Sequence, residues 1–593
     1  MINFFILHLS FFIKQIHIFH RWEIKNIPHY SFLIPHLTEG DVMALTEIIV
    51  KYNGDIFSVA DTFNSYAEIL SPNYAILSIE SSQINQLYSF PEIEDIELPK
   101  KLYLGTSFNL TSSCIRSVQA PYSYDLNGNG TVIGIIDSGI DYTHIDFRNK
   151  DGSTRILYLW DQTIDGSPPT SFNEGTEYTQ FQINSALQSD YPFDIVPSND
   201  FNGHGTAVAG IAAGNGNSSD GENIGVAFNA DLIIVKVGRN SNDFFAQSTD
   251  IMRAVRYIIS KSRELKKPVA VNMSFGMNSG SHKGGSLFEE YLSEISAEWK
   301  NVLVIPTGNE GGSGHHFNGS LKSNQVKEIE FFTASGISNF YLSLWKNFAD
   351  TFAVELIFPN GISSGVINIE NRLKTVRIDN MTLTVIYGQP TRYSVEQEIY
   401  FDIRANENYI RSGLWKLRII PSTIVDGNID IWLPTVEEVT AKTYFSDPSV
   451  YNTMTLPATA HKVIRVSGYN DRLGNIAEFS GNGVPDTSII PDIAAPAVNI
   501  ISARSGGGYD AFTGTSFAAP FVTGSAALMM QWGIVQGNAP FLYGERIRAF
   551  LRLGARRSDG IIYPNQTFGY GTLCLSNSVS YMERYKWGGF EIV

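Results

Sequence analysis

Cysteine is almost absent from this sequence of 593 residues, which contains only Cys114 and Cys574. Two thiols are too few for a disulfide network or a cysteine-ligated metal cluster, so cysteine usage does not indicate a compartment. Charged residues are also sparse, at 17%, whereas hydrophobic residues make up 43%. This balance is typical of a globular protein and excludes an intrinsically disordered chain. At this length two to four domains are expected, because a single core does not grow that large.

Positive charge is scarce as well. The chain has 43 Lys and Arg residues against 59 Asp and Glu residues, which gives a formal net charge of -16. Phosphate backbones and anionic lipids repel such a chain, so nucleic acid and membrane are excluded as partners. Asp146 is a candidate calcium ligand, but no acidic cluster around it requires a metal. We therefore predict no metal site and no other cofactor.

The N-terminal segment lacks the features of an export signal. Residues 1–22 are apolar and aromatic, but Lys14 and three histidines interrupt them. They include no basic start, no Ala-x-Ala cleavage pattern and no uncharged run of about 18 residues that could span a membrane. We therefore expect residues 1–26 to be a leader or unstructured segment without a clear signal peptide.

Three motifs carry the residues of a hydrolytic site. A strand-like run ends on a carboxylate at positions 135–139 (IIDSG), and a histidine opens a run of small residues at 202–210 (NGHGTAVAG). A serine precedes an apolar helical run at 514–520 (GTSFAAP). The resulting chain order, Asp137, His204 and Ser516, is the order of the subtilisin group. The chain thus resembles the subtilases, the subtilisin-like serine peptidases.

Each of these residue types has a chemical purpose. A serine hydroxyl is a weak nucleophile and needs a base beside it, which His204 would be before it protonates the leaving amine. Asp137 would hold the imidazole in the right tautomer and stabilise the imidazolium. A helix that begins near Ser516 would direct N–H groups toward developing negative charge. A lone Ser, His or Asp would be a surface or capping residue, but three extended motifs in the right order favour catalysis.

A fourth motif predicts an electrostatic role for Asn309. Residues 302–306 have the character of a buried strand and lead into the sequence TGNEG at 307–311. In subtilases the asparagine of such a Gly-Asn segment donates its amide to the oxyanion, and the resemblance implies this role for Asn309. A donor of this kind lowers the barrier by roughly 3–4 kcal/mol, a magnitude known from a subtilisin. An ordinary Asn-Glu-Gly turn is the alternative.

A fifth motif predicts where substrate binds. The resemblance implies that Ser274, Phe275 and Gly276, in an apolar strand, pair with an extended substrate through main-chain hydrogen bonds. The chain departs from the common subtilase pattern at three positions, which are Met277, Ala207 and Phe517. The first replaces a glycine and changes the expected shape of the primary specificity pocket. The other two leave the proposed proton path untouched.

Apolar runs alternate with helical patterns through the catalytic region. The runs are typical of parallel strands buried on both faces, and they lie at residues 131–137, 231–237, 269–275 and 302–305. Residues 250–265 and 287–299 have the period of amphipathic helices. The alternation predicts an α/β fold, a subtilisin-like parallel sheet flanked by helices. Site residues at strand ends fit the rule that open sheets bind ligands there.

Two further units accompany this pattern. Residues 27–105 alternate strands and helices, which predicts a propeptide-like α+β domain; an accessory domain is the alternative. Residues 324–445 show short alternating runs between turns, which predicts an inserted all-β sandwich or jelly roll. The catalytic domain would then comprise residues 106–323 and 446–593. Because the insert carries none of the five motifs, we expect it to stabilise or position rather than catalyse.

This layout narrows the resemblance to the Csp germination proteases of spore-forming clostridia. It implies a serine endopeptidase that acts through an acyl-enzyme on Ser516 and is made as an autoprocessed zymogen. Its partners would be a protein or peptide substrate and its own propeptide as intramolecular inhibitor. Some Csp members lack triad residues, so a non-catalytic, pseudoprotease-like regulatory protein of the same fold is the alternative. The resemblance also implies a bacterial protein that is spore-associated or secreted.

The tail after the α+β unit predicts the place of the propeptide cut. Residues 99–106 (PKKLYLGT) have no helix signals, and Leu98 before a proline favours extended geometry. Such a tail would pair with residues 274–276 and present Leu102 and Leu104 to alternate pockets. We therefore expect one intramolecular cut within residues 102–107.

Overall fold

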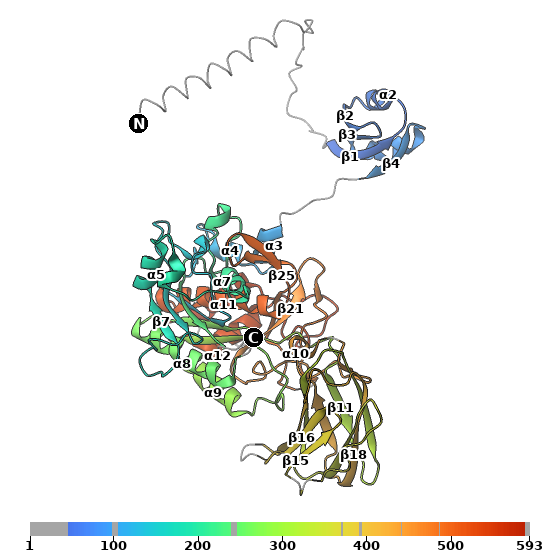
Figure 1. Ribbon diagram of the computed structural model, residues 1–593. Helices are drawn as coiled ribbons and strands as arrows, with labels where there is room; N and C mark the ends of the chain where they lie inside the picture. The colour runs from blue at the N-terminus through green and yellow to red at the C-terminus, as the bar shows by residue number, and fades with distance from the viewer. Residues whose placement is uncertain are drawn as a thin grey trace, which may run out of the picture. The chain divides into compact units, whose positions relative to one another are not determined.

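The chain forms two compact units, residues 1–103 and 104–593. The computed structural model describes residues 45–97, 105–238, 246–368, 370, 372–390, 394–440, 442–485 and 487–587 (Figure 1). The expected leader at 1–26 and most of the expected tail, residues 98–104, lie outside the described residues.

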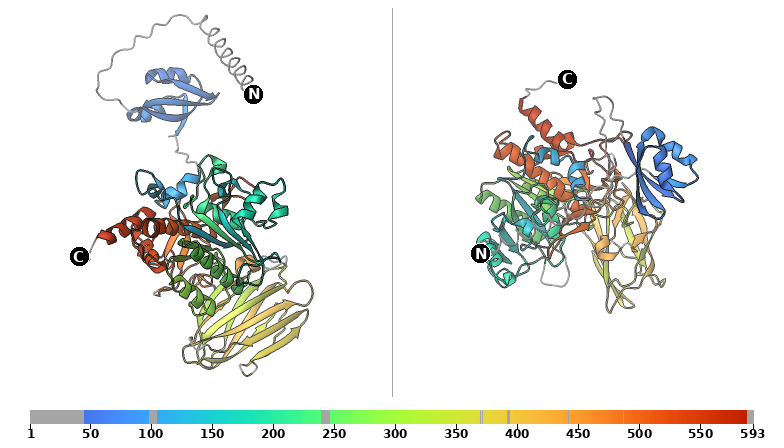
Figure 2. Two further views of the ribbon diagram at one scale, coloured as in Figure 1. Left: turned by 90° about the vertical axis from the view of Figure 1, so that its left-hand side faces the viewer. Right: turned by 90° about the horizontal axis from the view of Figure 1, so that it is seen from above.

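The first unit is built on a four-stranded antiparallel sheet of order β2-β3-β1-β4 (Figure 2). Its strands are β1 (Leu45–Tyr52), β2 (Ala67–Ser71), β3 (Tyr74–Glu80) and β4 (Ile93–Glu97). Helix α2 (Ile56–Thr62) begins after Asp55, which caps it, and a 3-10 helix, η2, covers Ser81–Ser89. Alternate strand residues such as Val50 and Leu77 pack with Val59 and Leu87 in one core.

The second unit is centred on a nine-stranded sheet of order β22-β21-β10-β9-β5-β8-β6-β7, with β23 paired to β21. Neighbours are parallel except in the pairs β6–β7 and β21–β22. The strands are β5 (Val132–Asp137), β6 (Ile156–Asp161), β7 (Thr176–Thr179), β8 (Asp231–Lys236), β9 (Val269–Met273), β10 (Asn301–Pro306), β21 (Ile464–Asn470), β22 (Asn475–Ile476) and β23 (Ile493–Pro496). The expected α/β fold with a parallel sheet is confirmed.

Helices cover both faces of this sheet, because its strands are apolar on both sides. Ile133 and Ile135 of β5 share a core with α7 (His204–Ala213) and α11 (Ala519–Met530). Ile136 shares another core with α8 (Ser248–Glu264) and α9 (Leu287–Ser296). The remaining helices of the unit are α3 (Gly105–Ser112), α4 (Arg116–Gln119), α5 (Gln180–Leu187), α6 (Pro192–Ile195), α10 (Val436–Val439), α12 (Gly544–Gly554) and α13 (Leu575–Trp587).

Short elements complete the catalytic part. They are η3 (Ile145–Phe147), η4 (Asn217–Ser219), η5 (Thr515–Phe517), the π-helical turn η6 (Gln531–Val535) and the hairpin β24 (Ile500–Ala503) with β25 (Tyr509–Phe512). Among the described residues, one helical segment, Thr515–Val535, is long and apolar enough to cross a membrane, but 89% of its most apolar window is buried inside the protein. It is the core helix of the unit. The start of α3 at Gly105 corrects the expectation of an extended tail through Thr106.

The expected all-β insert is a sandwich of two antiparallel sheets, of orders β11-β19-β13-β17-β16-β15 and β14-β18-β12-β20. Its strands are β11 (His316–Ser320), β12 (Lys327–Thr333), β13 (Asn339–Asn347), β14 (Thr351–Ile357), β15 (Leu373–Ile378), β16 (Met381–Tyr387), β17 (Glu396–Ala405), β18 (Gly413–Thr423), β19 (Asn428–Trp432) and β20 (Tyr444–Phe445). Inward side chains such as Phe331, Phe401 and Trp415 form its core. β11 lies before the start expected at residue 324, and a jelly-roll order of strands stays a prediction.

The sandwich is inserted between two strands that are neighbours in the parallel sheet. The chain leaves the sheet after β10, forms the sandwich and returns as β21, which pairs with β10. Residues 307–313, which follow β10 and which we call the oxyanion loop, therefore connect the catalytic sheet directly to the sandwich. This connection places the loop of Asn309 at the junction.

A disulfide joins Cys114, in the loop after α3, to Cys574, just before α13. The two residues are 460 positions apart in the sequence. The cysteine count alone did not predict this pairing, because two cysteines far apart in sequence give no sign that they meet.

We expect the disulfide to contribute about 2–5 kcal/mol to stability, because it closes a very long loop in the unfolded chain. The double variant Cys114→Ser/Cys574→Ser should unfold at a lower temperature than the wild type in calorimetry. Reductant should lower the midpoint of the wild type and leave that of the double variant unchanged. Identical midpoints for all four samples would contradict the expectation.

Candidate active site

The carboxylate of Asp137 meets the ring of His204 at the end of the central strand. β5 ends at Asp137 and α7 begins at His204, so a strand end and a helix start bring the side chains together. His204 Nδ1 lies 2.7 Å from Asp137 Oδ1. The aspartate side chain is 3% exposed and the histidine side chain 27% exposed. This is the arrangement of an orienting acid and a general base, in which Nδ1 donates and Nε2 takes the proton.

Asp200 connects the two segments that carry Asp137 and His204. It is buried and accepts hydrogen bonds from Gly203 N, from Thr206 N and Oγ1, and from Ser138 Oγ. Ser138 N in turn donates to Asp137 Oδ1. Asp200 thereby joins the first turn of α7 to the turn after β5. Its negative charge also interacts favourably with the partial positive charge at the N-terminus of α7. Sequence reasoning missed it, because a carboxylate shortly before a helix is usually an ordinary cap.

The charges around His204 shift its protonation equilibrium. Burial lowers the pKa of His204, but the charge and hydrogen bond of Asp137 raise it, and the charges of Asp200 and Glu437 raise it further. The net result is a pKa above the usual histidine value. The site therefore stabilises the imidazolium that a general base becomes when it accepts a proton.

Ser516 lies in η5, and the backbone of Ser516 and the ring of Phe517 contact two of the other predicted site residues. The ring of Phe517 lies 5.2 Å from the ring of His204, measured between centroids. The carbonyl oxygen of Ser516 accepts a hydrogen bond of 3.1 Å from Ser274 Oγ. The structure thus brings the segments of Asp137, His204, Ser274 and Ser516 together. The departure at Phe517 puts an aromatic ring beside the ring of His204.

The side chain of Asn309 has a defined orientation. Thr515 N lies 3.0 Å from Asn309 Oδ1, and Thr515 Oγ1 lies 3.1 Å from the same oxygen. Because a backbone N–H can only donate, the oxygen of Asn309 has to face Thr515, and its amide nitrogen points the other way. That nitrogen lies 3.2 Å from Glu437 Oε1 of α10. The amide nitrogen is therefore the group of this side chain that is left to donate a hydrogen bond.

The predicted substrate-binding residues lie just beyond a strand and not within it. β9 ends at Met273, so the expectation that the strand continues through Phe275 is corrected. Ser274 is held on both sides, since its hydroxyl accepts from Asn272 Nδ2 at 2.8 Å and donates to the carbonyl of Ser516. Ser274 is therefore fixed against the segment of Ser516.

Met277 is held by a short antiparallel bridge. Its N–H donates to Leu456 O at 3.0 Å, and Leu456 N donates back to Met277 O at 2.9 Å. The neighbouring Thr455 fills the space beside two glycines, because a Cβ at Gly276 or Gly308 would lie 2.4 Å from Thr455 Oγ1. A side chain at either glycine would displace Thr455.

Asp146, the candidate calcium ligand, has protein donors on both carboxylate oxygens. Oδ1 accepts from Ser218 N and Oγ, each at 2.8 Å, and Oδ2 accepts from the hydroxyl of Tyr509 at 2.6 Å. Within the described ranges, no group of three or more His, Cys, Asp or Glu side chains is placed to hold a metal ion. These contacts satisfy the carboxylate without a cation.

Two family models match the chain. The subtilase family matches residues 128–343 and 426–571, which together make up more than half of the sequence. The stretch between them lies in the β-sandwich. The Csp protease B prodomain matches residues 37–100, which contain the sheet of the first unit.

Individual relatives agree with these matches. The structure of the Clostridium perfringens CspB protease is similar with a TM-score of 0.73 and 38% identity, over 80% of this chain and 98% of that one. The PIII-type proteinase of Lactococcus lactis subsp. cremoris is 27% identical over 76% of this chain, and the minor extracellular protease Vpr of Bacillus subtilis is 22% identical over 78%. The match spans only 24% of the lactococcal proteinase and 53% of Vpr. The chain belongs to the subtilase family and, within it, resembles the Csp proteases.

Proposed function

We propose that this subtilase is a serine endopeptidase that acts through an acyl-enzyme on Ser516. The observation that carries the proposal is the 2.7 Å contact between His204 Nδ1 and Asp137 Oδ1. This contact leaves Nε2 of a half-buried ring as the proton acceptor, beside the segment that contains Ser516. Family membership supports the same reading.

The proposed reaction uses four side chains. Ser516 Oγ attacks the scissile carbonyl carbon while His204 Nε2 takes its proton, and Asp137 stabilises the imidazolium. The carbonyl oxygen becomes an oxyanion that the Asn309 amide stabilises. His204 then gives the proton to the leaving amine. Water, deprotonated by His204, attacks the acyl-enzyme in the same way, and the proton returns to Ser516 Oγ as the acid product leaves. We place the extended substrate along residues 274–276, at the carboxyl edge of the sheet.

The alternative is a non-catalytic regulatory protein of the same fold. It is not favoured, because all three triad residue types are present and the base is already oriented by its carboxylate. The side chain of Asn309 is also held in one orientation, with its oxygen on Thr515 N and its amide nitrogen on Glu437.

We further propose that the chain is made as a zymogen whose first unit acts as an intramolecular inhibitor of the peptidase. The match of residues 37–100 to the Csp protease B prodomain supports this. The Cys114–Cys574 disulfide favours an oxidising environment, in keeping with a secreted or spore-associated protein. The expected division into residues 27–105, 106–323, 324–445 and 446–593 remains part of this proposal.

Ser516→Ala should abolish peptide hydrolysis and labelling by a fluorophosphonate probe, because it removes the nucleophile and nothing else. Asn309→Ala should lower kcat by roughly a hundred- to a thousandfold with a smaller change in KM. Ser117→Ala, at an exposed serine of α4, is the matched control and should behave as the wild type. Near-normal turnover of the Ser516 variant would disprove the assignment.

The pH dependence of kcat/KM should reflect the raised pKa of His204. Only the neutral ring accepts a proton, so activity should be lost as the pH falls through a pKa above the usual histidine value. Glu437→Gln removes a negative charge that raises this pKa, so the acid limb should move to lower pH. Glu294→Gln, at an exposed position of α9, should leave the limb in place. An acid limb of kcat/KM at the same pH in Glu437→Gln and in the wild type would contradict the electrostatic argument.

Autoprocessing should produce one cut within residues 102–107. Because α3 begins at Gly105 and a protease needs an extended substrate, the bonds before α3 are the favoured ones. N-terminal sequencing should find the new terminus in the wild type and an uncut chain in Ser516→Ala. Equal cleavage of both proteins, or a fully active uncut enzyme, would leave the first unit as an accessory domain.

A further inference from the structure

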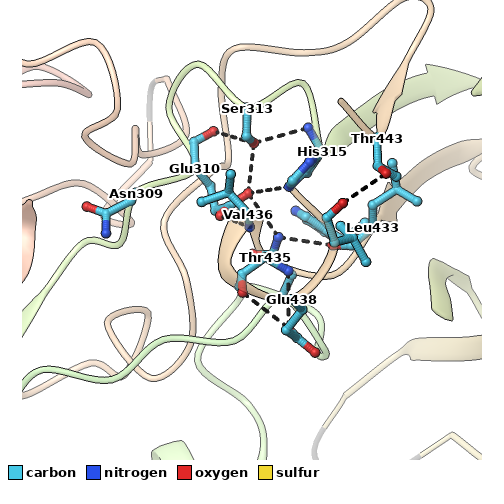
Figure 3. Close-up of polar contacts among 12 residues, drawn as sticks. Asn309, Glu310, Ser313, His315, Leu433, Thr435, Val436, Glu438 and Thr443 are labelled. Atoms are coloured by element: carbon cyan, nitrogen blue, oxygen red, sulfur yellow. Dashed lines mark hydrogen bonds and ion pairs between the residues drawn. The ribbon is translucent and has the colours of Figure 1, made fainter. Parts of the chain in front are cut away.

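The residue that follows the oxyanion donor is buried at the junction with the β-sandwich. Glu310 is 2% exposed, and its carboxylate accepts three short hydrogen bonds. Oε2 accepts from His315 Nδ1 and from Ser313 Oγ, each at 2.7 Å, and Oε1 accepts from Val436 N at 2.8 Å (Figure 3). Figure 3 shows the side chain of Asn309 directed away from this cluster.

Glu310 is charged in this environment. Burial alone would raise the pKa of Glu310, but the hydrogen bond and charge of His315, together with Val436 N–H and Ser313 Oγ, hold it below its usual value. A buried carboxylate with three donors resists displacement, because moving it would leave a charge and several donors unpaired. Its position is therefore fixed by groups on two sides of the junction.

Helix α10 holds the oxyanion loop at two consecutive residues. Val436 N binds the carboxylate of Glu310, and the carboxylate of Glu437 receives the amide of Asn309. α10 itself begins with a capping box, in which Glu438 accepts from Thr435 N and Oγ1. It follows β19 of the sandwich after a short connection. The single turn of α10 thus links the sandwich to the side chains of Asn309 and Glu310.

The backbone of the loop is held on both sides of the Asn309–Glu310 pair, since Gly481 N donates to Gly308 O at 3.0 Å and Gly311 N donates to Phe479 O at 2.8 Å. The pair between these two contacts is flanked by glycines, of which Gly308 has a φ of +85°. Glycine on both sides of the Asn309–Glu310 pair lowers the local cost of other conformations. A displacement of about 1 Å at a catalytic group is enough to cost roughly a hundredfold in rate. An anchor on the next residue limits such displacement.

We propose that Glu310 is a positioning residue that sets the oxyanion amide of Asn309 by fastening the oxyanion loop to α10 of the sandwich. Glu310 does not touch substrate and acts through Asn309. The inference rests on the proposed function, since it assigns a support to the oxyanion donor. It gives the inserted sandwich a specific part in the reaction.

The test is a double-mutant cycle between Glu310 and Asn309, with each variant expressed as the whole chain and assayed after its processing. Glu310→Gln should lower kcat by about tenfold, less than a 1 Å displacement would cost, with KM within about twofold. In the Asn309→Ala background the same change should lower kcat by no more than about twofold, because its target is already gone. The readouts are hydrolysis of a peptide nitroanilide selected from a library with the wild type, and the rate of fluorophosphonate labelling.

A buried carboxylate elsewhere in the sandwich supplies the matched control. Asp350 is fully buried and accepts hydrogen bonds from the backbone N–H groups of Val425, Asp426 and Gly427. Asp350→Asn should lower the thermal midpoint of the protein and leave kcat unchanged. A loss of kcat in Asp350→Asn equal to that in Glu310→Gln would reduce Glu310 to a general structural role and overturn the inference.

A second pair of variants covers the case in which Glu310→Gln does not fold. His315→Asn retains an N–H donor near the position of Nδ1, whereas His315→Leu removes it. The asparagine variant should keep kcat near the wild-type value and the leucine variant should lower it, again without effect when Asn309 is alanine.

If the double variant lost kcat by the product of the two single losses, or if Glu310→Gln changed KM alone, the positioning role would be overturned. The peptidase assignment would remain intact. A wild-type protein that neither hydrolyses peptides nor reacts with the probe would overturn the proposed function and, with it, this inference.

Discussion

A buried charge at the end of a strand constrains the whole site. Asp137 terminates β5, whose six residues are all buried, and a carboxylate in that position is stable only with donors around it. His204 and Ser138 supply donors to its Oδ1, so α7 begins beside the strand end. Small residues permit the approach, since a Cβ at Gly205 would lie 2.2 Å from Gly139 O. The positions of the helix start and the histidine ring follow from one unsolvated carboxylate.

The sequence was a good guide where a local pattern carries the information. Continuous apolar runs identified the buried strands β5, β8, β9 and β10, and short alternating runs identified the insert as all-β. The residues Asp137, His204 and Asn309 were predicted because their motifs specify backbone as well as side chain. Asp200, Glu310 and the Cys114–Cys574 pair were missed, because their partners are set by tertiary structure and leave no periodic signal. The helix at Gly105 was missed for a related reason, since α3 has little amphipathic pattern of its own.

The junction between the sandwich and the catalytic part is built as one packed region. The ring of Trp432, at the end of β19, stacks between two histidine rings, at 4.0 Å from His282 and 4.7 Å from His316. Flat rings in contact on both faces allow little sliding. The aromatic stack and the hydrogen bonds of Glu310 thus lie at the same junction. The insert is held to the catalytic sheet by its end, close to the loop that follows β10.

The disulfide divides the chain topologically. Residues 114–574 form a covalent ring, which contains the triad, Asn309 and the entire sandwich. A single cut anywhere in this ring opens it but frees no fragment, whereas one cut before Cys114 detaches everything on its N-terminal side. For the peptidase activity proposed above, cleavage by another copy would have different consequences on the two sides of Cys114. An accidental nick in the ring leaves the molecule in one piece, and the first unit belongs to the part that a single cleavage can release.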